Sequence, residues 1–495
     1  MEKELPEGWV EIGFKEVISY KKGKKPRILK NEEFGDSVPY LDIRALEHGD
    51  FRQYADIECS NLVADDSVAI VWDGARSGWV AKVKYGAIGS TIAALSPILV
   101  DVDYTYYYLR SQFRYLNTNT RGTGIPHVDP EVLWSLNFPL PPLAEQKRIV
   151  AKLDEGFQHL DTLKAKLERI PELLKNFRRA ILTQAVTGKL TEEWREDKEG
   201  LQTGEQVYQD VLHDLEIDFQ SRLKRAKEEG RSKPKDHRKN KKSDKQPISL
   251  LDLPEEWCYV RAEDISYLIT DGAHFKPTYI EEGVKFLSVK NVRPFRISAE
   301  DCKYISVQEH TNLIKRCNPE PNDLLYTKVG ATYGYAAKIQ EAYEFSIFVS
   351  LALIKPSKIL DSRFLEILFN SELVFEQARQ RVSGSGVPDL HLIEIRDFRL
   401  PLMSIEEQKE IVKRVEALFA KADAIEGYYA TIKEKIDKLP QALLAKAFRG
   451  ELVPQDPNDE PASVLLGKIR IAKAGAVKLG KGKKAKGGKQ GKLVL

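Results

Sequence analysis

The chain has 495 residues and a formal net charge of +3, a length that predicts about two to four domains with cores of their own. Its four cysteines (Cys59, Cys258, Cys302 and Cys317) show no CxxC spacing, which favours free thiols in a reducing compartment over a metal site or a disulfide frame. Because no apolar run reaches membrane-spanning length and no signal peptide is recognisable, we expect a cytoplasmic protein with no membrane contact.

A large unit is duplicated once along the chain. Residues 139–190 and 401–452 align at a constant offset of 262 with 16 identities over 52 positions, where average composition predicts about three. Upstream, LPEGW at Leu5–Trp9 matches LPEEW at Leu253–Trp257 at an offset of only 248. Each copy therefore has a globular head whose length drifts, followed by a helical region whose register is held. Such a pattern is expected when the heads read something that differs between the two halves.

Both heads are expected to be mixed α+β domains with a mainly antiparallel sheet. Helical patterns occur at Tyr104–Asn117 and Arg363–Arg381. Short runs of β-branched and aromatic residues, bounded by Gly, Asp, Asn and Pro, predict strands. These runs are Val68–Trp72, Val80–Lys84, Leu324–Val329 and Phe345–Leu353.

The two helical regions carry one apolar stripe each. Apolar residues recur in steps of three and four from Ile149 to Ile181, and again from Ile411 to Leu443. Forty helical residues make a rod of about 60 Å. A lone helix with so narrow a stripe gains little from burial, so we expect the two regions to pack together antiparallel.

Glycines and prolines predict where these helices end or change direction. Gly188 and Gly450 stand where a helix would end, a common position for a C-terminal cap. Pro171 and Pro440 lie inside the pattern at non-equivalent positions, and each should kink or break its helix. The sequence leaves open whether each rod is one kinked helix or two.

Low-complexity segments follow both helical regions at corresponding places. Short amphipathic helices are expected at Thr203–Ile217 and Asp459–Ile471. A basic insert at 225–248 follows the first, and a basic tail with ten Lys/Arg and no acid, at 467–495, overlaps and follows the second. Such blocks are more often solvated tails than nucleic-acid arms.

Motifs for catalysis are missing from the sequence. There is no P-loop, no Asp/Asn-Pro-Pro-aromatic tetrad of an adenine methyltransferase, and no HExxH or HxxxH spacing. We therefore expect no catalytic residue and no metal site. Gly74–Gly78 and its counterpart Gly330–Gly334 are too short for a dinucleotide fingerprint. They are better explained as tight turns, although a glycine turn could also let backbone approach a duplex.

Nucleic-acid binding is the chemistry that the residues do support. Basic residues with aromatics or amides nearby recur at matched loop positions of the two heads, and such side chains have donors for base edges and phosphates. For any single residue, a solvated surface role is the alternative. The candidate DNA-binding residues are Arg44, Arg76 and Arg121 in the first head, with Lys290, Asn291, Arg293, Lys328 and Tyr333 in the second.

Several of these motifs resemble a known family. LPEGW, TGIPHV, PLPPLAEQKRIV, AVTGKLTEEWRE and FRGELVPQDPNDEPASVLL are similar to segments of type I restriction–modification specificity subunits, over essentially residues 1–470. The resemblance implies that each head reads one half of a bipartite asymmetric site in double-stranded DNA. It also implies that the helices set the spacing and dock two modification subunits, to which restriction subunits are added.

By the same resemblance this chain is a non-catalytic subunit that binds no cofactor itself. S-adenosylmethionine, ATP and Mg²⁺ would be used by the partner subunits. A sequence-nonspecific basic nucleic-acid binder, a coiled-coil adaptor and a methyltransferase with its own site remain as alternatives. The first would lose binding when the basic segments are deleted, and the last would bind S-adenosylmethionine as an isolated chain.

The predicted architecture is α+β, with two target-recognition domains separated by two long antiparallel helices in a pseudo-twofold repeat. The predicted segments are 1–138 (first head), 139–190 (first helical region), 191–250 (charged helix and linker), 251–400 (second head), 401–452 (second helical region) and 453–495 (short helix and basic tail).

Overall fold

The computed structural model describes residues 5–122, 124–230, 232–234, 236, 250–340, 343–383 and 386–485, with side chains described as far as residue 475. Most of the basic insert and the end of the basic tail lie outside the described residues. The chain forms two compact units, one made of Met1–Glu168 with Ala430–Leu495 and the other of Arg169–Tyr429. Each unit therefore contains one head and helical segments from both copies of the repeat.

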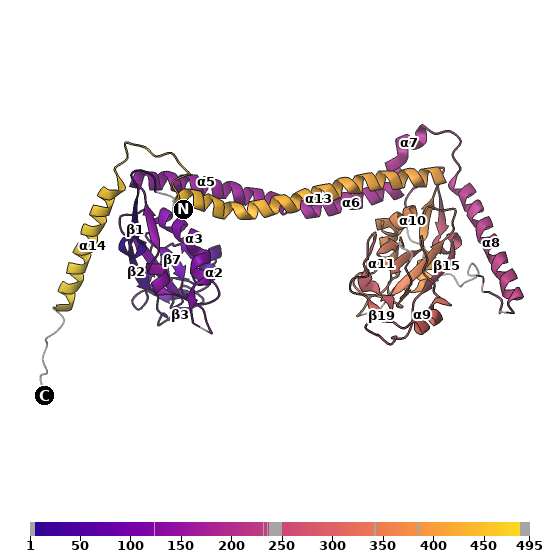
Figure 1. Cartoon of the computed structure of the whole chain (residues 1–495), viewed down its shortest axis with the longest axis horizontal. Helices are drawn as coiled ribbons and strands as arrows, with labels where there is room; N and C mark the ends of the chain where they lie inside the picture. Colours follow the sequence, from indigo (N-terminus) through magenta and orange to yellow (C-terminus); the bar gives the residue numbers. More distant parts are fainter. Residues whose placement is uncertain are drawn as a thin grey trace, which may run out of the picture. The chain divides into compact units, whose positions relative to one another are not determined.

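The first head is rich in short strands (Figure 1). Its elements are β1 (Val10–Gly13), α1 (Phe14–Val17), β2 (Ile18–Lys22), β3 (Leu29–Lys30), β4 (Ser37–Leu41), α2 (Ile43–His48), β5 (Tyr54–Asp56), β6 (Leu62–Val63), β7 (Val68–Val71), β8 (Val80–Lys82), β9 (Gly86–Ile88), β10 (Ile92–Pro97), α3 (Val102–Thr118), β11 (Thr120–Arg121), β12 (His127–Val128), α4 (Pro130–Trp134) and β13 (Asn137–Leu140).

The second head repeats this order with local changes. Its elements are β14 (Cys258–Arg261), η3 (Ala262–Ile265), β15 (Ser266–Asp271), β16 (Val284–Leu287), η4 (Val289–Asn291), β17 (Val292–Arg293), β18 (Arg296–Ile297), β19 (Lys303–Ile305), α9 (Val307–Ile314), β20 (Leu324–Thr327), β21 (Ala336–Lys338), β22 (Phe345–Ile347), β23 (Leu351–Pro356), α10 (Ser362–Phe369), α11 (Glu372–Arg381), α12 (Leu392–Arg396) and β24 (Arg399–Leu402).

The central sheets of the two heads have the same topology. The strand orders are β2-β10-β7-β8 in the first head and β15-β23-β20-β21 in the second, and every pair in both sheets is antiparallel. A two-stranded ribbon accompanies each sheet, β1 with β13 and β14 with β24. Parallel pairing occurs at β4–β9 and at β16–β22. The predicted α+β class with a mainly antiparallel sheet is confirmed.

The predicted helix at Arg363–Arg381 is two helices, α10 and α11. The break falls at Asn370, whose side-chain amide pairs with both backbone groups of Ala336, accepting from its N–H at 3.0 Å and donating to its carbonyl at 2.9 Å. Ser371 then caps α11 by accepting from the Val374 N–H at 3.5 Å. An amide that binds the edge of a strand competes with helix continuation, which the apolar periodicity alone does not show.

The two copies of the helical region differ in continuity. The first is divided into α5 (Leu143–Leu167) and α6 (Ile170–Val186), with Pro171 in the first turn of α6, where a missing N–H costs no hydrogen bond. The second is the single helix α13 (Ile405–Phe448), which continues through Pro440 (Figure 1). One rod is thus two helices and the other is one helix.

The remaining helices follow each copy. A short turn η1 (Lys189–Thr191) leads to α7 (Glu192–Glu196) and α8 (Gly204–Glu228), and the second copy leads to α14 (Ala462–Ala485). Thr203 and Gln206 form a capping box at the start of α8. Both α8 and α14 are longer than the short helices expected from the sequence. Among the described residues, no helix is both long and apolar enough to cross a membrane.

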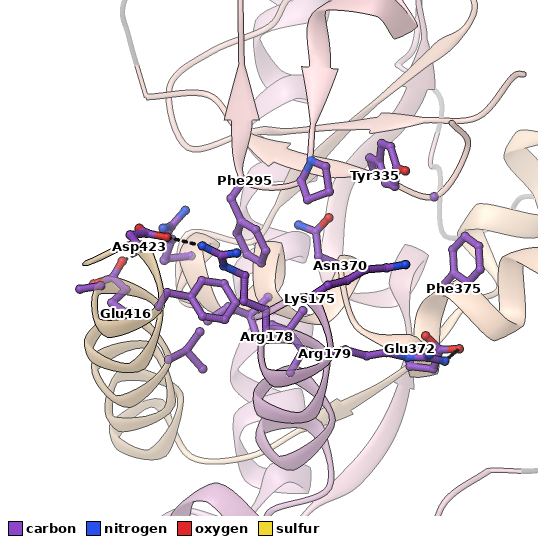
Figure 2. Close-up of a pocket in the computed structure, with 18 residues that line it drawn as sticks. Lys175, Arg178, Arg179, Phe295, Tyr335, Asn370, Glu372, Phe375, Glu416 and Asp423 are labelled. Atoms are coloured by element: carbon purple, nitrogen blue, oxygen red, sulfur yellow. Dashed lines mark hydrogen bonds and ion pairs between the residues drawn. The ribbon is translucent and has the colours of Figure 1, made fainter. Parts of the chain in front are cut away.

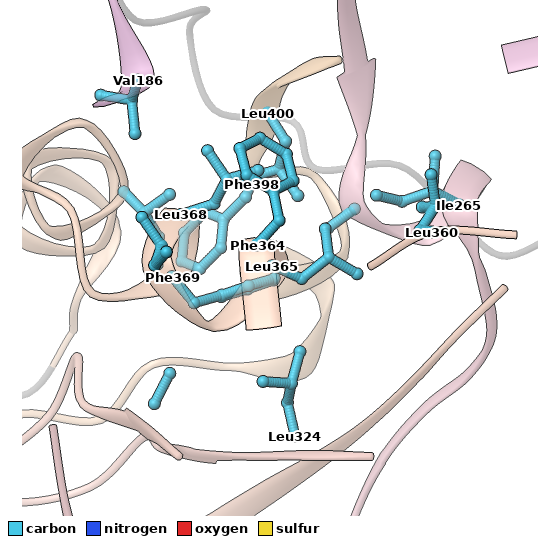
Figure 3. Packing of buried hydrophobic residues seen from close by; sticks show 14 of the residues in the cluster. Val186, Ile265, Leu324, Leu360, Phe364, Leu365, Leu368, Phe369, Phe398 and Leu400 are labelled. Carbon is cyan, nitrogen blue, oxygen red and sulfur yellow. The ribbon is translucent and has the colours of Figure 1, made fainter. Parts of the chain in front are cut away.

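Helices from both copies complete the core of each unit. In the first unit, Ile149, Leu153 and Phe157 of α5 share one core with Leu444 of α13 and Leu465 of α14. In the second unit, the end of α6, the start of α13 and one face of α8 join the core of the second head. Val186 of α6 belongs to the same core as Phe398, Leu400 and the phenyl rings of α10, which Figure 3 draws.

A buried carboxylate joins the head to the helices in each unit. Glu145 of α5 accepts a hydrogen bond from the Trp9 indole N–H at 2.9 Å and another from the Gln455 amide at 3.2 Å. Because Gln455 follows α13, the start of α5 lies beside the end of α13. The two helices therefore run antiparallel in this unit.

The second unit repeats this arrangement around Glu407 of α13. Its carboxylate accepts from the Trp257 indole at 2.9 Å, the Thr191 hydroxyl at 2.7 Å and the Arg195 guanidinium at 2.6 Å. Here the segment after α6 meets the start of α13, so these helices are also antiparallel.

The glycines at the helix ends are required by close packing. Gly188 and Gly450 both have left-handed backbone conformations, with φ of 76° and 69°, which confirms their predicted role in ending the helices. A Cβ atom on Gly188 would lie 2.4 Å from Cγ of Pro254, and one on Gly450 would lie 2.1 Å from Cγ of Pro6. Each proline belongs to the repeated LPE(G/E)W motif.

Removing the buried carboxylates should destabilise the two units unequally. Glu407→Ala leaves the largely buried Arg195 without this partner and should lower the free energy of unfolding of the second unit by about 3–5 kcal/mol. Glu145→Ala leaves neutral donors unpaired and should cost about 1–3 kcal/mol. Denaturant titration with unit-resolved hydrogen exchange measures both. The exposed neighbour Glu406→Ala is the control, and an equal loss for Glu406→Ala and Glu407→Ala would contradict the prediction.

Candidate nucleic-acid interface

Two loops that the sequence matched between the heads lie side by side in each head. In the first, the N–H of Gly74 donates to the carbonyl of Pro126 at 2.8 Å. In the second, the N–H of Gly330 donates to the carbonyl of Pro388 at 2.9 Å. The glycine turn, which follows β7 or β20, is thus tied to a second loop, which precedes the last small helix of the head. The glycine turn is Gly74–Gly78 or Gly330–Gly334, and the second loop contains Pro126 or Pro388. The same contact has been kept in both copies.

The glycine turns are tight turns, as the sequence predicts. Gly78 and Gly334 have φ of 88° and 95°, which side chains rarely tolerate. A Cβ atom would approach Cβ of Leu116 to 2.8 Å in the first head and Cδ2 of Phe375 to 2.7 Å in the second. These glycines let the turn lie directly on a helix of the head.

A small charged cluster lies at the loop end of the first central sheet. Asp73, just after β7, accepts from Nδ1 of His127 at 2.7 Å, and its other oxygen is 3.9 Å from the Lys22 ammonium at the end of β2. Tyr20 lies on β2 near Lys22, and its pKa is raised by burial and by the Asp73 carboxylate. The cluster joins β2, β7 and the second loop.

The second head has a charged cluster at the same place, formed by different residues. The Lys328 ammonium after β20 is 3.9 Å from Asp271 at the end of β15 and 3.4 Å from Asp389 of the second loop. Strand β15 carries the acid where β2 carries Lys22. The base of the second head does not take the position of Asp73, because Lys328 corresponds to Trp72: the carbonyls of Trp72 and Lys328 accept from the matched N–H groups of Val128 and Leu390. The scaffold is the same in the two heads, but its charged residues differ in kind and position.

The first-head candidates all lie at the surface. Arg44 in α2 pairs with Asp50 at 2.9 Å, and Arg76 in the glycine turn pairs with Glu47 at 2.7 Å. The hydrogen bond from Arg76 lowers the pKa of Glu47. Arg121 is exposed on β11, beside the second loop. The turn and the second loop therefore bring Arg76 and Arg121 to one end of the head.

Three second-head candidates remain accessible. Lys290 is exposed on η4, and Arg293 is exposed on β17 with one guanidinium N–H donated to the Val292 carbonyl at 2.7 Å. Tyr333 is half-buried in the glycine turn and stacks on Phe375 with ring centroids 5.7 Å apart.

Asn291 and Lys328 are instead used inside the second head. The Asn291 side chain is 5% exposed, accepts from the Ser288 N–H and donates to the Ser298 carbonyl, both at 2.9 Å. Lys328 is 5% exposed and holds the charged cluster. Their side chains shape the loops, so a contact with a ligand would require these internal bonds to be exchanged.

A basic run in the first head was not among the sequence candidates. Five of the seven positions 21–27 are Lys or Arg, all of them exposed. The run begins at the end of β2, beside the charged cluster, and is positioned by Gly23. A Cβ atom there would lie 2.1 Å from the Gly89 carbonyl oxygen. The signal that could have identified this run is the local charge density next to a predicted turn.

Comparison with known proteins decides between the interpretations of this geometry. The model of the type I restriction modification DNA specificity domain matches residues 6–172 and 254–434, that is, once per head with part of the helical region that follows it. The chain belongs to this family.

Type I specificity subunits match the chain over nearly its whole length. The chain is 28% identical to the specificity subunit of the type I restriction enzyme EcoBI of Escherichia coli, over 95% of this chain and 93% of that protein. It is 26% identical to the EcoKI specificity subunit of Escherichia coli strain K12, over 95% and 96%. The specificity-subunit interpretation is thereby confirmed over a nonspecific basic binder or a coiled-coil adaptor.

Solved structures of type I proteins share the fold. The HsdS subunit from Thermoanaerobacter tengcongensis matches with a TM-score of 0.53 at 18% identity, over 91% of this chain and 99% of that one. A chain from a structure of the assembly and conformational transition of the type I R-M system matches with a TM-score of 0.59 at 18% identity, over 91% and 100%.

The second unit of this family member also contains a cavity of about 1000 Å³ between α6, α13, α10 and α11 (Figure 2). Its wall is apolar around Phe295 and Phe419, and its charges are compensated in pairs. Arg178 of α6 reaches Asp423 of α13 at 2.6 Å, as Figure 2 shows. In the part of the chain that the structure describes, no group of three or more His, Cys, Asp or Glu is arranged to hold a metal.

The charged cluster of the second head should hold its glycine turn in place. Lys328→Met leaves buried Asp271 with only Arg316 and His274, and should lower the free energy of unfolding of the second unit by about 3 kcal/mol. Amides of residues 330–334 should exchange faster in hydrogen-exchange mass spectrometry. The exposed Lys290→Met is the control, expected within about 0.5 kcal/mol of wild type. Unchanged exchange at 330–334 would show that the ion pair does not hold the turn.

Proposed function

We propose that this chain is the DNA-reading subunit of a type I restriction–modification complex in which each head reads one half of a bipartite, asymmetric site in double-stranded DNA. The observation that carries this proposal is that both heads have the same glycine turn and second loop at one end. The two heads share one scaffold, down to the Gly–Pro hydrogen bond between their loops, and carry different charged residues at those loops. A repeated frame with different loop side chains fits two readers of different sequences.

The helical regions have a second role in this proposal. They set the spacing between the half-sites and dock two modification subunits, and restriction subunits complete the complex. The chain itself is non-catalytic and acts in the cytoplasm. Methylation with S-adenosylmethionine and ATP-driven steps with Mg²⁺ belong to the partner subunits. The sequence-predicted segments, with heads at 1–138 and 251–400, are the functional divisions of the chain in this scheme.

Basic residues of the loop ends supply the DNA contacts. In the first head these are Arg44, Arg76 and Arg121, supported by the exposed run at 21–27. In the second head Lys290, Arg293 and Tyr333 contact DNA from accessible positions. Asn291 and Lys328 belong to the same loops and position them. Guanidinium and ammonium groups suit both phosphates and guanine edges, while the tyrosine ring offers a stacking face.

Exchange of one head should change one half of the recognised sequence. Residues 10–135 are replaced by the corresponding head of another specificity subunit, and the complex is assembled with its modification subunits. Sequencing of the methylated genome should show one new half-site, with the other half-site and the spacing retained. The reciprocal exchange of residues 258–398 is the matched control. A change in both half-sites from a single exchange would show that the heads are not independent readers.

Loss of a phosphate-binding arginine should reduce the salt dependence of binding. For the assembled complex, Arg76→Ala and Arg121→Ala should each lower the slope of log K against log salt by about one, because about 0.9 counterion is released per neutralised phosphate. Fluorescence anisotropy from 50 to 200 mM salt measures the slope. Arg470→Ala, an exposed arginine of α14, should leave it unchanged. Equal slopes for all three variants would remove Arg76 and Arg121 from the interface.

A further inference from the structure

An exposed apolar side chain stands at the tip of the second loop in both heads. Ile125 and Val387 occupy equivalent positions at the offset of 262, and each is 61% exposed. They are among the most exposed large hydrophobic residues of the described chain, although neither lies on a helix that a partner helix could cover.

The loop geometry makes these residues tips in both heads. In the first head, Arg121 pairs with His127 in a short antiparallel ladder, and Ile125 lies in the connection between them. In the second head, Ser383 and Asp389 pair in the same way, with backbone hydrogen bonds of 3.0 and 2.9 Å, around the connection that holds Val387. The same backbone pairing therefore supports the second loop in both heads, although the paired residues differ.

The tip side chains are held stiffly. Each precedes a proline, Pro126 or Pro388, which restricts the preceding backbone to extended conformations, and each is β-branched, which restricts its own rotamer. The proline carbonyl is fixed by the N–H of Gly74 or Gly330. A side chain that is already ordered loses little conformational entropy when it is buried by a partner.

In the first head, the surroundings of the tip indicate a polyanion and not a protein surface. In the first head, Arg121 lies on the same hairpin, and the glycine turn that holds Pro126 also carries Arg76. In the first head, a single apolar tip between cations fits a groove with phosphates at its edges better than it fits a broad apolar patch. The hairpin of Val387 carries Asp389 in place of a cation, so Val387 is given the same role from its equivalent position and exposure. Apolar side chains that enter a DNA groove pack against base edges or between base steps.

We propose that Ile125 and Val387 are apolar tips that enter a groove of the half-site DNA and pack against the bases there. This inference rests on the proposed function, because it assigns a role to both heads within the same DNA complex. The residue type is shared by heads whose neighbouring charges differ. The tip therefore supplies a contact common to both half-sites, and the polar neighbours supply the difference between them.

The test uses the assembled methylating complex and a duplex containing the site that the wild-type complex methylates. Ile125→Ala should weaken binding about tenfold and Val387→Ala about fivefold, with an unchanged salt slope because no charge is removed. Ile125→Val should retain most of the affinity. Leu99→Ala is the control. It removes a side chain that is 52% exposed and lies after the C-terminal end of β10, away from the second loop, so this variant should bind like wild type.

The outcomes separate this inference from the proposed function. If wild type methylates a bipartite site but Ile125→Ala and Val387→Ala bind it as wild type does, the tip contact is overturned and the reading function stands. If either variant fails to assemble with the modification subunits without DNA, the tip is a protein contact and the inference is also overturned. If wild type methylates no bipartite site, the proposed function itself fails.

Discussion

The buried hydrogen bond between a tryptophan indole and a glutamate carboxylate is the contact on which each unit depends. Glu145 and Glu407 stand at the start of their helices and receive a tryptophan from the start of the head in the same copy. The same carboxylates also receive donors from the segment that follows the helix of the other copy. One acidic side chain therefore fixes the head, the helix that leaves it and the helix that returns to it.

Once these carboxylates are in place, the loop ends of the heads can vary. Asp101 and Asp361, which cap α3 and α10, donate their backbone N–H groups to Gln146 and Gln408, the residues after each glutamate. The hydrogen bonds between the head and the start of its helix are thus the same in both copies. At the other end, the clusters of Lys22 and Lys328 are formed by residues that differ in kind and position between the heads. Duplication preserved the frame and left the loop surface free to diverge.

Much of this fold could be predicted from the sequence because its signals are local or repeated. The apolar stripe predicted the helical regions, and the glycines at 188 and 450 predicted their ends. Other features depend on contacts between distant residues. Asn370 divides a predicted helix by binding Ala336, and Pro440 stays within α13 while Pro171 begins a new helix. Periodicity cannot distinguish these two prolines, because both interrupt the same pattern.

The candidate interface remains a prediction, and the structure shows which of its residues are accessible. Matched loops lie side by side at one end of each head, but side-chain burial decides which residues a ligand can reach. Asn291 and Lys328 have suitable donors, yet the chain folds those donors inward. Ile125 and Val387 were passed over because an apolar residue in a loop carries no signal of its own. Only its exposed fraction in both heads makes it notable.

The mixed origin of each unit has an evolutionary consequence. Pro6, near the start of the chain, packs against Gly450, and Pro254 of the second copy packs against Gly188 of the first. A half-length ancestor with one head and one helical region would have had no partner for either surface within its own chain. Two such molecules would complete each other through an isologous interface, each lending its helix end to the other's head. Fusion of the two genes would then have converted a symmetric homodimer into one chain whose halves could recognise different things.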